Sequence, residues 1–250
     1  MNTLERFSNR VENYIKYRPG YPPGVLQLFV DELGLTKNSI VADVGSGTGI
    51  SARIFLENGN TVFAVEPNDA MRGAAEALLA GYPGFHSVKA TAEATSLGES
   101  SVDFVVSAQA FHWFDQQKAR QEFSRIVRFD GIVALIWNQR QVDTTPFLIE
   151  YEKFLLNYAN DYEQVRHENV NEEALGSFFG KPYSRRSFEN VQIFDFAGLK
   201  GRVMSSSYMP TETDPRFPQM VDELERLFAK HAESDKIEVF YDTIVNWSSI

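Results

Sequence analysis

Residues that could hold a nucleoside gather at positions 41–49, which read VADVGSGTG. Glycines there let the backbone turn sharply and approach a ligand without an obstructing Cβ atom. Asp43 would repel a pyrophosphate, but it suits a ligand without phosphates that carries a cationic amino-acid end. Glu66 follows Gly45 by about 20 residues, the separation at which a carboxylate accepts the ribose hydroxyl hydrogens in nucleotide-binding sheets. S-adenosylmethionine has both features, so the pattern predicts a site for it.

The glycine spacing also bears on the competing cofactor, a nicotinamide dinucleotide. That fingerprint requires Gly-x-Gly-x-x-Gly, whereas Gly45, Gly47 and Gly49 here alternate and position 50 is Ile. An NAD(P)-dependent oxidoreductase is therefore the alternative, together with a protein that binds the cofactor without catalysis. A plain strand-to-helix turn flanked by surface acids is a further interpretation.

Alternating apolar runs and helical stretches must position these side chains. Five short strands are expected at residues 40–44, 61–65, 85–90, 102–107 and 132–137. Their alternation with helices predicts a parallel α/β sheet, whose ligands bind at the carboxyl ends of the strands. Residues 144–180 look helical, and strand character returns at 188–196. A helix at 217–231 and an extended segment at 237–247 complete the pattern.

Four segments of the chain resemble the class I, Rossmann-like S-adenosylmethionine-dependent methyltransferases: residues 41–49, 63–71, 90–94 and 102–115. The opening YRPGYP at residues 17–22 is similar to the group around trans-aconitate methyltransferase. The resemblance implies an α/β fold with a doubly wound, seven-stranded, mostly parallel sheet and a helical insertion after the fifth strand. It also implies four parts: an N-terminal cap segment at 1–38, a cofactor-binding core at 39–140, a helical insertion or lid at 141–186 and a sheet-completing part at 187–250.

The family's cofactor-binding roles carry over where residues match. The glycine loop would line the methionine part, and Pro67 and Met71 would flank the adenine. Glu93 would accept from the adenine amine, although an acid at the start of a helix is the alternative. The implied cofactor site comprises Asp43, Gly45, Ser46, Gly47, Thr48, Gly49, Glu66, Pro67, Met71, Ala92, Glu93, Gln109, Tyr17 and Arg18. The cofactor would leave as S-adenosylhomocysteine.

Methyl transfer from a sulfonium is an in-line displacement, for which the enzyme places the acceptor atom opposite sulfur. His112 could serve as general base for a hydroxyl or amine acceptor, although a histidine that only packs is an equal alternative. A carboxylate acceptor would need arginine forks instead, with Arg18 and Arg140 best placed and Arg185 or Arg202 more remote. Substrate-binding residues are expected at Tyr14, Trp113, Trp137, Arg140 and Tyr208.

The composition limits the other classes of protein. The net charge of −10 disfavours a nucleic-acid partner. The chain has no cysteine and its four histidines are scattered, so neither disulfides nor a metal site is expected. There is no signal-peptide pattern, no apolar run of about 20 residues and no basic amphipathic helix, which predicts a cytoplasmic protein without a membrane partner. The expected acceptor is a small molecule, with an organic acid as the first candidate.

Overall fold

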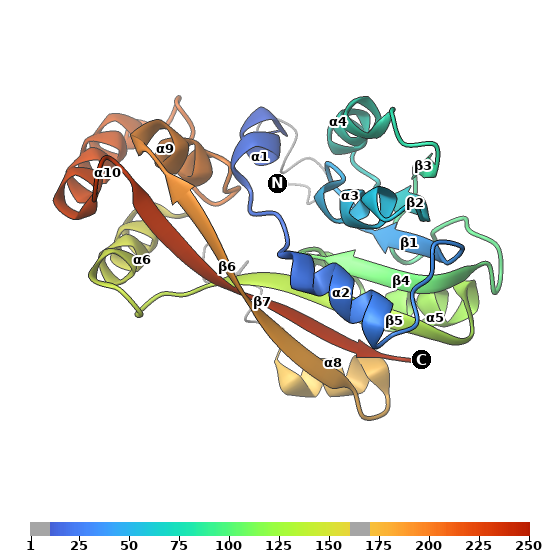
Figure 1. The fold of residues 1–250 in the computed structure, drawn as a ribbon. Helices are drawn as coiled ribbons and strands as arrows, with labels where there is room; N and C mark the ends of the chain where they lie inside the picture. Colours follow the sequence, from blue (N-terminus) through green and yellow to red (C-terminus); the bar gives the residue numbers. More distant parts are fainter. Residues whose placement is uncertain (1–10, 161–170) are drawn as a thin grey trace.

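The computed structural model describes residues 11–160 and 171–250. Its strands are β1 (Ile40–Val44), β2 (Thr61–Val65), β3 (Phe85–Val88), β4 (Val102–Ala108), β5 (Val127–Arg140), β6 (Ser184–Phe194) and β7 (Ile237–Ser248). They form one sheet in the order β3-β2-β1-β4-β5-β7-β6 (Figure 1). The first five strands run parallel, and β7 is antiparallel to both of its neighbours. This confirms the predicted class I methyltransferase fold.

Two helical layers cover the sheet because its central strands are apolar on both faces. Val41 and Ala42 are neighbours on β1 and point to opposite faces, and both are fully buried. One face packs against α2 (Pro23–Asp31), α3 (Ile50–Glu57) and α4 (Asp69–Leu79). The other packs against α5 (Gln116–Ile126) and α8 (Glu172–Phe179). The sheet is therefore doubly wound, as predicted.

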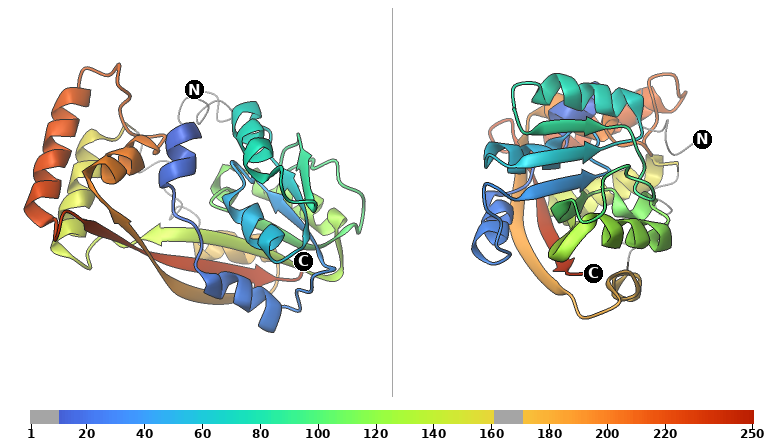
Figure 2. Two further views of the ribbon diagram at one scale, coloured as in Figure 1. Left: turned by 45° about the horizontal axis from the view of Figure 1, so that its top comes forward. Right: turned by 90° about the vertical axis from the view of Figure 1, so that its right-hand side faces the viewer.

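A third apolar cluster lies beyond this sandwich, where β6 and β7 extend past the other strands (Figure 2). It joins α6 (Pro146–Tyr158), α9 (Phe196–Met204) and α10 (Phe217–His231). Helix α1 (Val11–Tyr17) lies between α9 and α4, with contacts to both (Figure 1). The carboxyl ends of the parallel strands, α1 and α9 all contribute residues to one pocket.

The region 141–186 divides between two places in the fold. Its helix α6 belongs to the third cluster, whereas α8 packs against α5 below the sheet. Residues 161–170, as well as residues 1–10 of the predicted cap segment, lie outside the described residues. The lid at 141–186 stays a prediction, which hydrogen exchange with and without cofactor can test.

Side-chain caps fix the starts of two helices. The Asn68 side chain accepts a hydrogen bond from the backbone N–H of Met71 at 2.9 Å, and α4 begins directly after this cap. Asp115 does the same for Lys118 at 3.2 Å, at the start of α5. Within the described ranges, no helix combines the length and the apolar character needed to cross a membrane.

Candidate functional site

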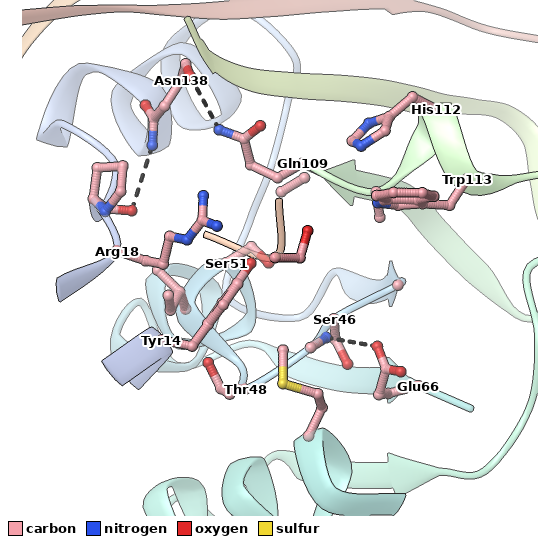
Figure 3. A pocket seen from close by; sticks show the side chains of 18 of the residues that line it. Tyr14, Arg18, Ser46, Thr48, Ser51, Glu66, Gln109, His112, Trp113 and Asn138 are labelled. Atoms are coloured by element: carbon pink, nitrogen blue, oxygen red, sulfur yellow. Dashed lines mark hydrogen bonds between the residues drawn. The ribbon is translucent and has the colours of Figure 1, made fainter. Parts of the chain in front are cut away.

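A pocket lies at the carboxyl ends of β1, β2, β4 and β5, between them and α1 (Figure 3). Helices α3 and α5, which follow β1 and β4, cover opposite faces of the sheet, so these adjacent strands form the switch point where ligands of open α/β sheets bind. Many of the predicted residues meet in its wall: Tyr14, Arg18, Gly45, Ser46, Gly47, Thr48, Glu66, Pro67, Met71, Gln109, His112, Trp113, Arg140 and Tyr208.

The glycine loop can follow only one path across the floor of this pocket. The backbone N–H groups of Gly45 and Ser46 both donate to the carbonyl of Val65, at 2.9 and 3.1 Å. Gly45 has a φ of +73°, and a Cβ atom there would lie 2.5 Å from the Cβ of Ala110. A residue with a side chain would be both strained and obstructed at this position. The loop therefore requires glycine at position 45 to take this path.

Three polar atoms around the loop are buried without a hydrogen-bond partner in the described structure. They are Asp43 Oδ1, Ser46 Oγ and Thr48 Oγ1. Buried polar groups are almost always paired, so a cluster of unpaired ones is expected where a ligand supplies the partners. The ammonium and carboxylate of an amino acid offer both donors and acceptors. These residues fit the methionine end of S-adenosylmethionine.

Asp43 itself lies beneath the loop rather than in the pocket wall, and its side chain is fully buried. Its Oδ2 accepts a hydrogen bond from the Ser51 hydroxyl at 2.7 Å. Burial raises the pKa of the Asp43 carboxyl to about 7, although the Ser51 hydrogen bond opposes this. A nearby cation would favour the charged form of this carboxyl.

Glu66 directly follows β2 and is 8% exposed, with both carboxylate oxygens held in place. Oε2 accepts from the backbone N–H of Gly47 at 2.9 Å, and Oε1 accepts from that of Asn68 at 2.8 Å. Burial raises the pKa of Glu66, against the two backbone hydrogen bonds. Each oxygen keeps a further lone pair, so the carboxylate can accept two ribose hydroxyl hydrogens. Met71 lies beside it in the wall, where an adenine would rest.

Two arginines border the pocket on the side of α1 and α9. Arg18 donates through Nη2 to the carbonyl of Ser205 at 3.0 Å, and its Nε is buried without a partner. Arg202 is 8% exposed and donates to the hydroxyls of Tyr241 and Ser206, at 3.3 and 2.9 Å. Neither guanidinium forms an ion pair with an acid of the described residues. Burial, followed by the charge of Arg202, lowers the pKa of Arg18.

Arg140 is the third arginine of the pocket, and it differs from the other two. Its Nη2 donates to Glu152, which compensates its charge. Its guanidinium also lies 5.1 Å from the ring centroid of Tyr151. Among the described residues of the pocket, Arg18 and Arg202 are therefore the arginines without an ion pair to an acid.

The far wall comes from the tip of β4 and the short helix η2 (Phe111–Trp113). Gln109 has a φ of +58°, a conformation uncommon for a residue with a side chain, and its amide donates to the Asn138 carbonyl at 3.2 Å. His112 and Trp113 face the pocket opposite Arg18, and their ring centroids lie 4.8 Å apart (Figure 3). These rings stand where an acceptor could meet the transferred methyl group.

Several other predicted residues do not line the pocket. Trp137 packs edge-on against Phe111 at 6.2 Å in the core, because it points to the opposite face of β5 from its neighbour Asn138. Ala92 is likewise part of this core, and Glu93 accepts the backbone N–H of Asp115 at 3.0 Å. The remaining two face other elements: Gly49 faces α4, and the Tyr17 ring packs on Gly201 of α9.

Some lining residues were not predicted as site residues: Pro19, Tyr21, Ile50, Ser51, Asn68, Ala108, Ala110, Phe114, Asn138, Arg202, Ser207 and Tyr241. Arg202 was considered only as a remote option. Asn138 could have been found from the alternation of side chains along β5, where it follows the apolar positions of the strand. Arg202 and Tyr241 lie on α9 and β7, far along the chain from the glycine loop, and no local pattern marks them.

Comparisons with known proteins agree with this geometry. A family model for a methyltransferase domain matches residues 42–135. An uncharacterized methyltransferase-like protein of Schizosaccharomyces pombe is 28% identical, covering 96% of this chain and 94% of the relative. A Saccharomyces cerevisiae protein described as a probable S-adenosylmethionine-dependent methyltransferase is 30% identical, covering 60% and 53% of the two chains.

The fold has a solved counterpart in a protein of Anaeromyxobacter dehalogenans described as a type II methyltransferase. The two structures superpose with a TM-score of 0.71 at 20% identity, over 93% of this chain and 97% of the other. None of these similarities points to an oxidoreductase.

Proposed function

Because this chain is a class I S-adenosylmethionine-dependent methyltransferase, we propose that it methylates a carboxylate of a small organic acid. One observation carries the proposal: Arg18 and Arg202 border the pocket, largely withdrawn from water, without an acid to pair with them. Removing a charge from water is unfavourable unless it is paired. An anionic acceptor would supply the missing partner.

The overall negative charge of the chain makes the lack of acidic partners for these two arginines more informative. The net charge is −10, so acids are abundant, yet none of the described acids pairs with these two guanidinium groups. Guanidinium forks match the planar geometry of a carboxylate. The likeness of residues 17–22 to the group around trans-aconitate methyltransferase points to the same class of acceptor.

The proposed roles of the cofactor residues follow from their contacts. Bound S-adenosylmethionine would supply an electrophilic methyl group on a sulfonium. Glu66 would accept from the ribose hydroxyls, while Ser46 and Thr48 would pair with the amino-acid end. Asp43, beneath the loop, would contribute its negative charge. The aromatic ring of Tyr14 would border the sulfonium from α1.

The acceptor would need orientation rather than deprotonation. A carboxyl group with an ordinary pKa of about 4 is already ionised at neutral pH. The arginines would hold the acid, and Trp113 would limit the water that reaches it. His112 has no required role with this acceptor. It would act as a base only if the acceptor were a hydroxyl or an amine.

The test is a methyl-transfer assay with labelled cofactor and a panel of small acids, amines and alcohols. Arg18→Met and Arg202→Met should each lower kcat/KM for the acids by about 10- to 100-fold, the effect of losing one hydrogen bond to a charged group. Cofactor binding by calorimetry should persist. Arg53→Met is the matched control, because Arg53 is exposed and its ion pair is with Glu57 of its own helix.

Two outcomes would contradict the proposal. The wild-type protein could methylate amines or alcohols while leaving every acid untouched. Alternatively, Arg18→Met and Arg202→Met could methylate acids as well as the control does. In either case the two arginines would need another explanation.

A further inference from the structure

Polar side chains collect on one face of the long β5-β7-β6 part of the sheet. Residues that are paired across neighbouring strands share a face, and so do residues two positions apart. Asn138 is paired with Thr243, and Tyr241 is paired with Asn190. Gln192 lies two positions beyond Asn190 on β6. The register therefore aligns these side chains on one face, the face turned toward α1 and α9.

This polar face binds the backbone of residues 17–20, which we call the strap. The amide of Gln192 donates to the Tyr17 carbonyl at 3.1 Å. The amides of Asn138 and Asn190 both donate to the Gly20 carbonyl, at 3.0 and 2.9 Å. Side chains from β5 and β6 thus hold the strap at both of its ends. Arg18, the pocket arginine, lies between them.

A hydrogen-bonded chain runs from the second pocket arginine to the same strap. Arg202 Nε donates to the Tyr241 hydroxyl at 3.3 Å, and that hydroxyl donates to Gln192 Oε1 at 2.9 Å. An arginine can only donate, so the Tyr241 hydroxyl proton must point onward to Gln192. The Gln192 oxygen is then occupied, which leaves its NH₂ group to donate to the Tyr17 carbonyl. The donors and acceptors of Arg202, Tyr241 and Gln192 therefore have one consistent orientation along this series of hydrogen bonds.

We infer that Gln192 is a positioning residue of the acceptor site, which sets the location of Arg18 relative to Arg202. It contacts the strap on one side and, through Tyr241, Arg202 on the other. This inference rests on the proposed function, in which the two arginines bind the acid together. Gln192 does not itself line the pocket. Its effect on the acceptor must therefore pass through the strap or through Tyr241 and Arg202.

The physical reason is preorganisation. Arg18 comes from an N-terminal segment whose backbone is tied to the sheet largely by side-chain amides, whereas Arg202 comes from a helix packed in the third cluster. If the strap were loose, part of the binding energy of the acid would be spent on ordering it. A strap that is fixed beforehand keeps the two guanidinium groups at one spacing.

The first measurement is hydrogen exchange of the peptide covering residues 11–21 in the whole protein. Gln192→Leu should increase its exchange by about three- to tenfold, the effect of losing one intramolecular hydrogen bond. Gln192→Glu should act similarly, because a carboxylate can accept from Tyr241 but cannot donate to the Tyr17 carbonyl. Val191→Ala is the matched control, since Val191 is 46% exposed and points to the other face of β6.

The second measurement is steady-state kinetics with a methylated acid. Gln192→Leu should raise KM for the acid by a similar factor and leave kcat near that of Val191→Ala. In an Arg18→Met background, Gln192→Leu should have no further effect on KM, because the group that it positions is gone. A residue with a general structural role would give additive effects.

The outcomes separate the two proposals. Unchanged exchange of residues 11–21 in Gln192→Leu, or equal changes in Val191→Ala, would overturn the positioning role whatever the acceptor is. Additive effects on KM would overturn it as well. If exchange increases as expected but the wild-type protein methylates no acid, the strap contact of Gln192 is upheld and the carboxylate acceptor is not.

Discussion

Replacing Asp43 by Asn tests whether the carboxyl beneath the glycine loop is buried without a compensating positive charge when no cofactor is bound. In the folded, cofactor-free protein, burial raises the pKa of Asp43 from an ordinary value of 3.8 to about 7. The folded state therefore binds this proton more tightly than the unfolded chain does. The free energy of unfolding must therefore fall as the pH rises from the ordinary pKa of 3.8 to the folded-state pKa of about 7, and it changes little at higher pH.

The size of the effect follows from the shift. Each pH unit of difference is worth about 1.4 kcal/mol. Between pH 5 and pH 7 the wild-type protein should lose about 2 kcal/mol of stability through Asp43, with little further loss up to pH 8. Asp43→Asn has no charge to bury and should lack this component. The amide oxygen of the introduced Asn can take the place of Asp43 Oδ2 and accept from the Ser51 hydroxyl, so the local packing is preserved.

The assay is urea unfolding of both proteins at pH 5, 6, 7 and 8, without and with saturating cofactor. Asp69→Asn is the control, since that exposed carboxylate has a pKa lowered by its hydrogen bonds to Lys89 and Arg72. With saturating cofactor, the pH-dependent loss of stability in the wild-type protein should become smaller. The reason is that the ammonium group of the cofactor favours the charged carboxylate of Asp43. Parallel pH profiles for the wild-type protein and Asp43→Asn in the absence of cofactor would refute the reasoning.

Three further substitutions test the pocket. Gly45→Ala places a Cβ atom against Ala110 at a positive φ. It should lower the free energy of unfolding by about 1–3 kcal/mol and weaken cofactor binding in calorimetry. A variant that is as stable as the wild-type protein and binds the cofactor equally well would contradict the loop geometry. Glu66→Ala should raise the cofactor Kd by about 10- to 100-fold through loss of its charged hydrogen bonds, and an unchanged Kd would remove the ribose role. His112→Asn should leave the rate of acid methylation intact, and a pH-dependent loss of kcat would instead assign it as a base.

Local sequence patterns were enough to predict the proposed cofactor half of the site. Asp43, the glycines and Glu66 lie within one strand-helix-strand unit, so their order along the chain fixes their order in space. The periodicity of apolar residues likewise predicted the first five strands. These are local features, which short stretches of sequence encode directly.

The proposed acceptor half depended more strongly on the tertiary structure. Arg202 and Tyr241 reach the pocket because β7 inserts antiparallel beside β5 and because α9 packs next to α1. Trp137, a predicted wall residue, instead entered the core, since the register of β5 turned Asn138 toward the pocket. A shift of one residue along a strand exchanges its two faces. Spacing in the sequence cannot report which residues from distant elements face one another across a cavity.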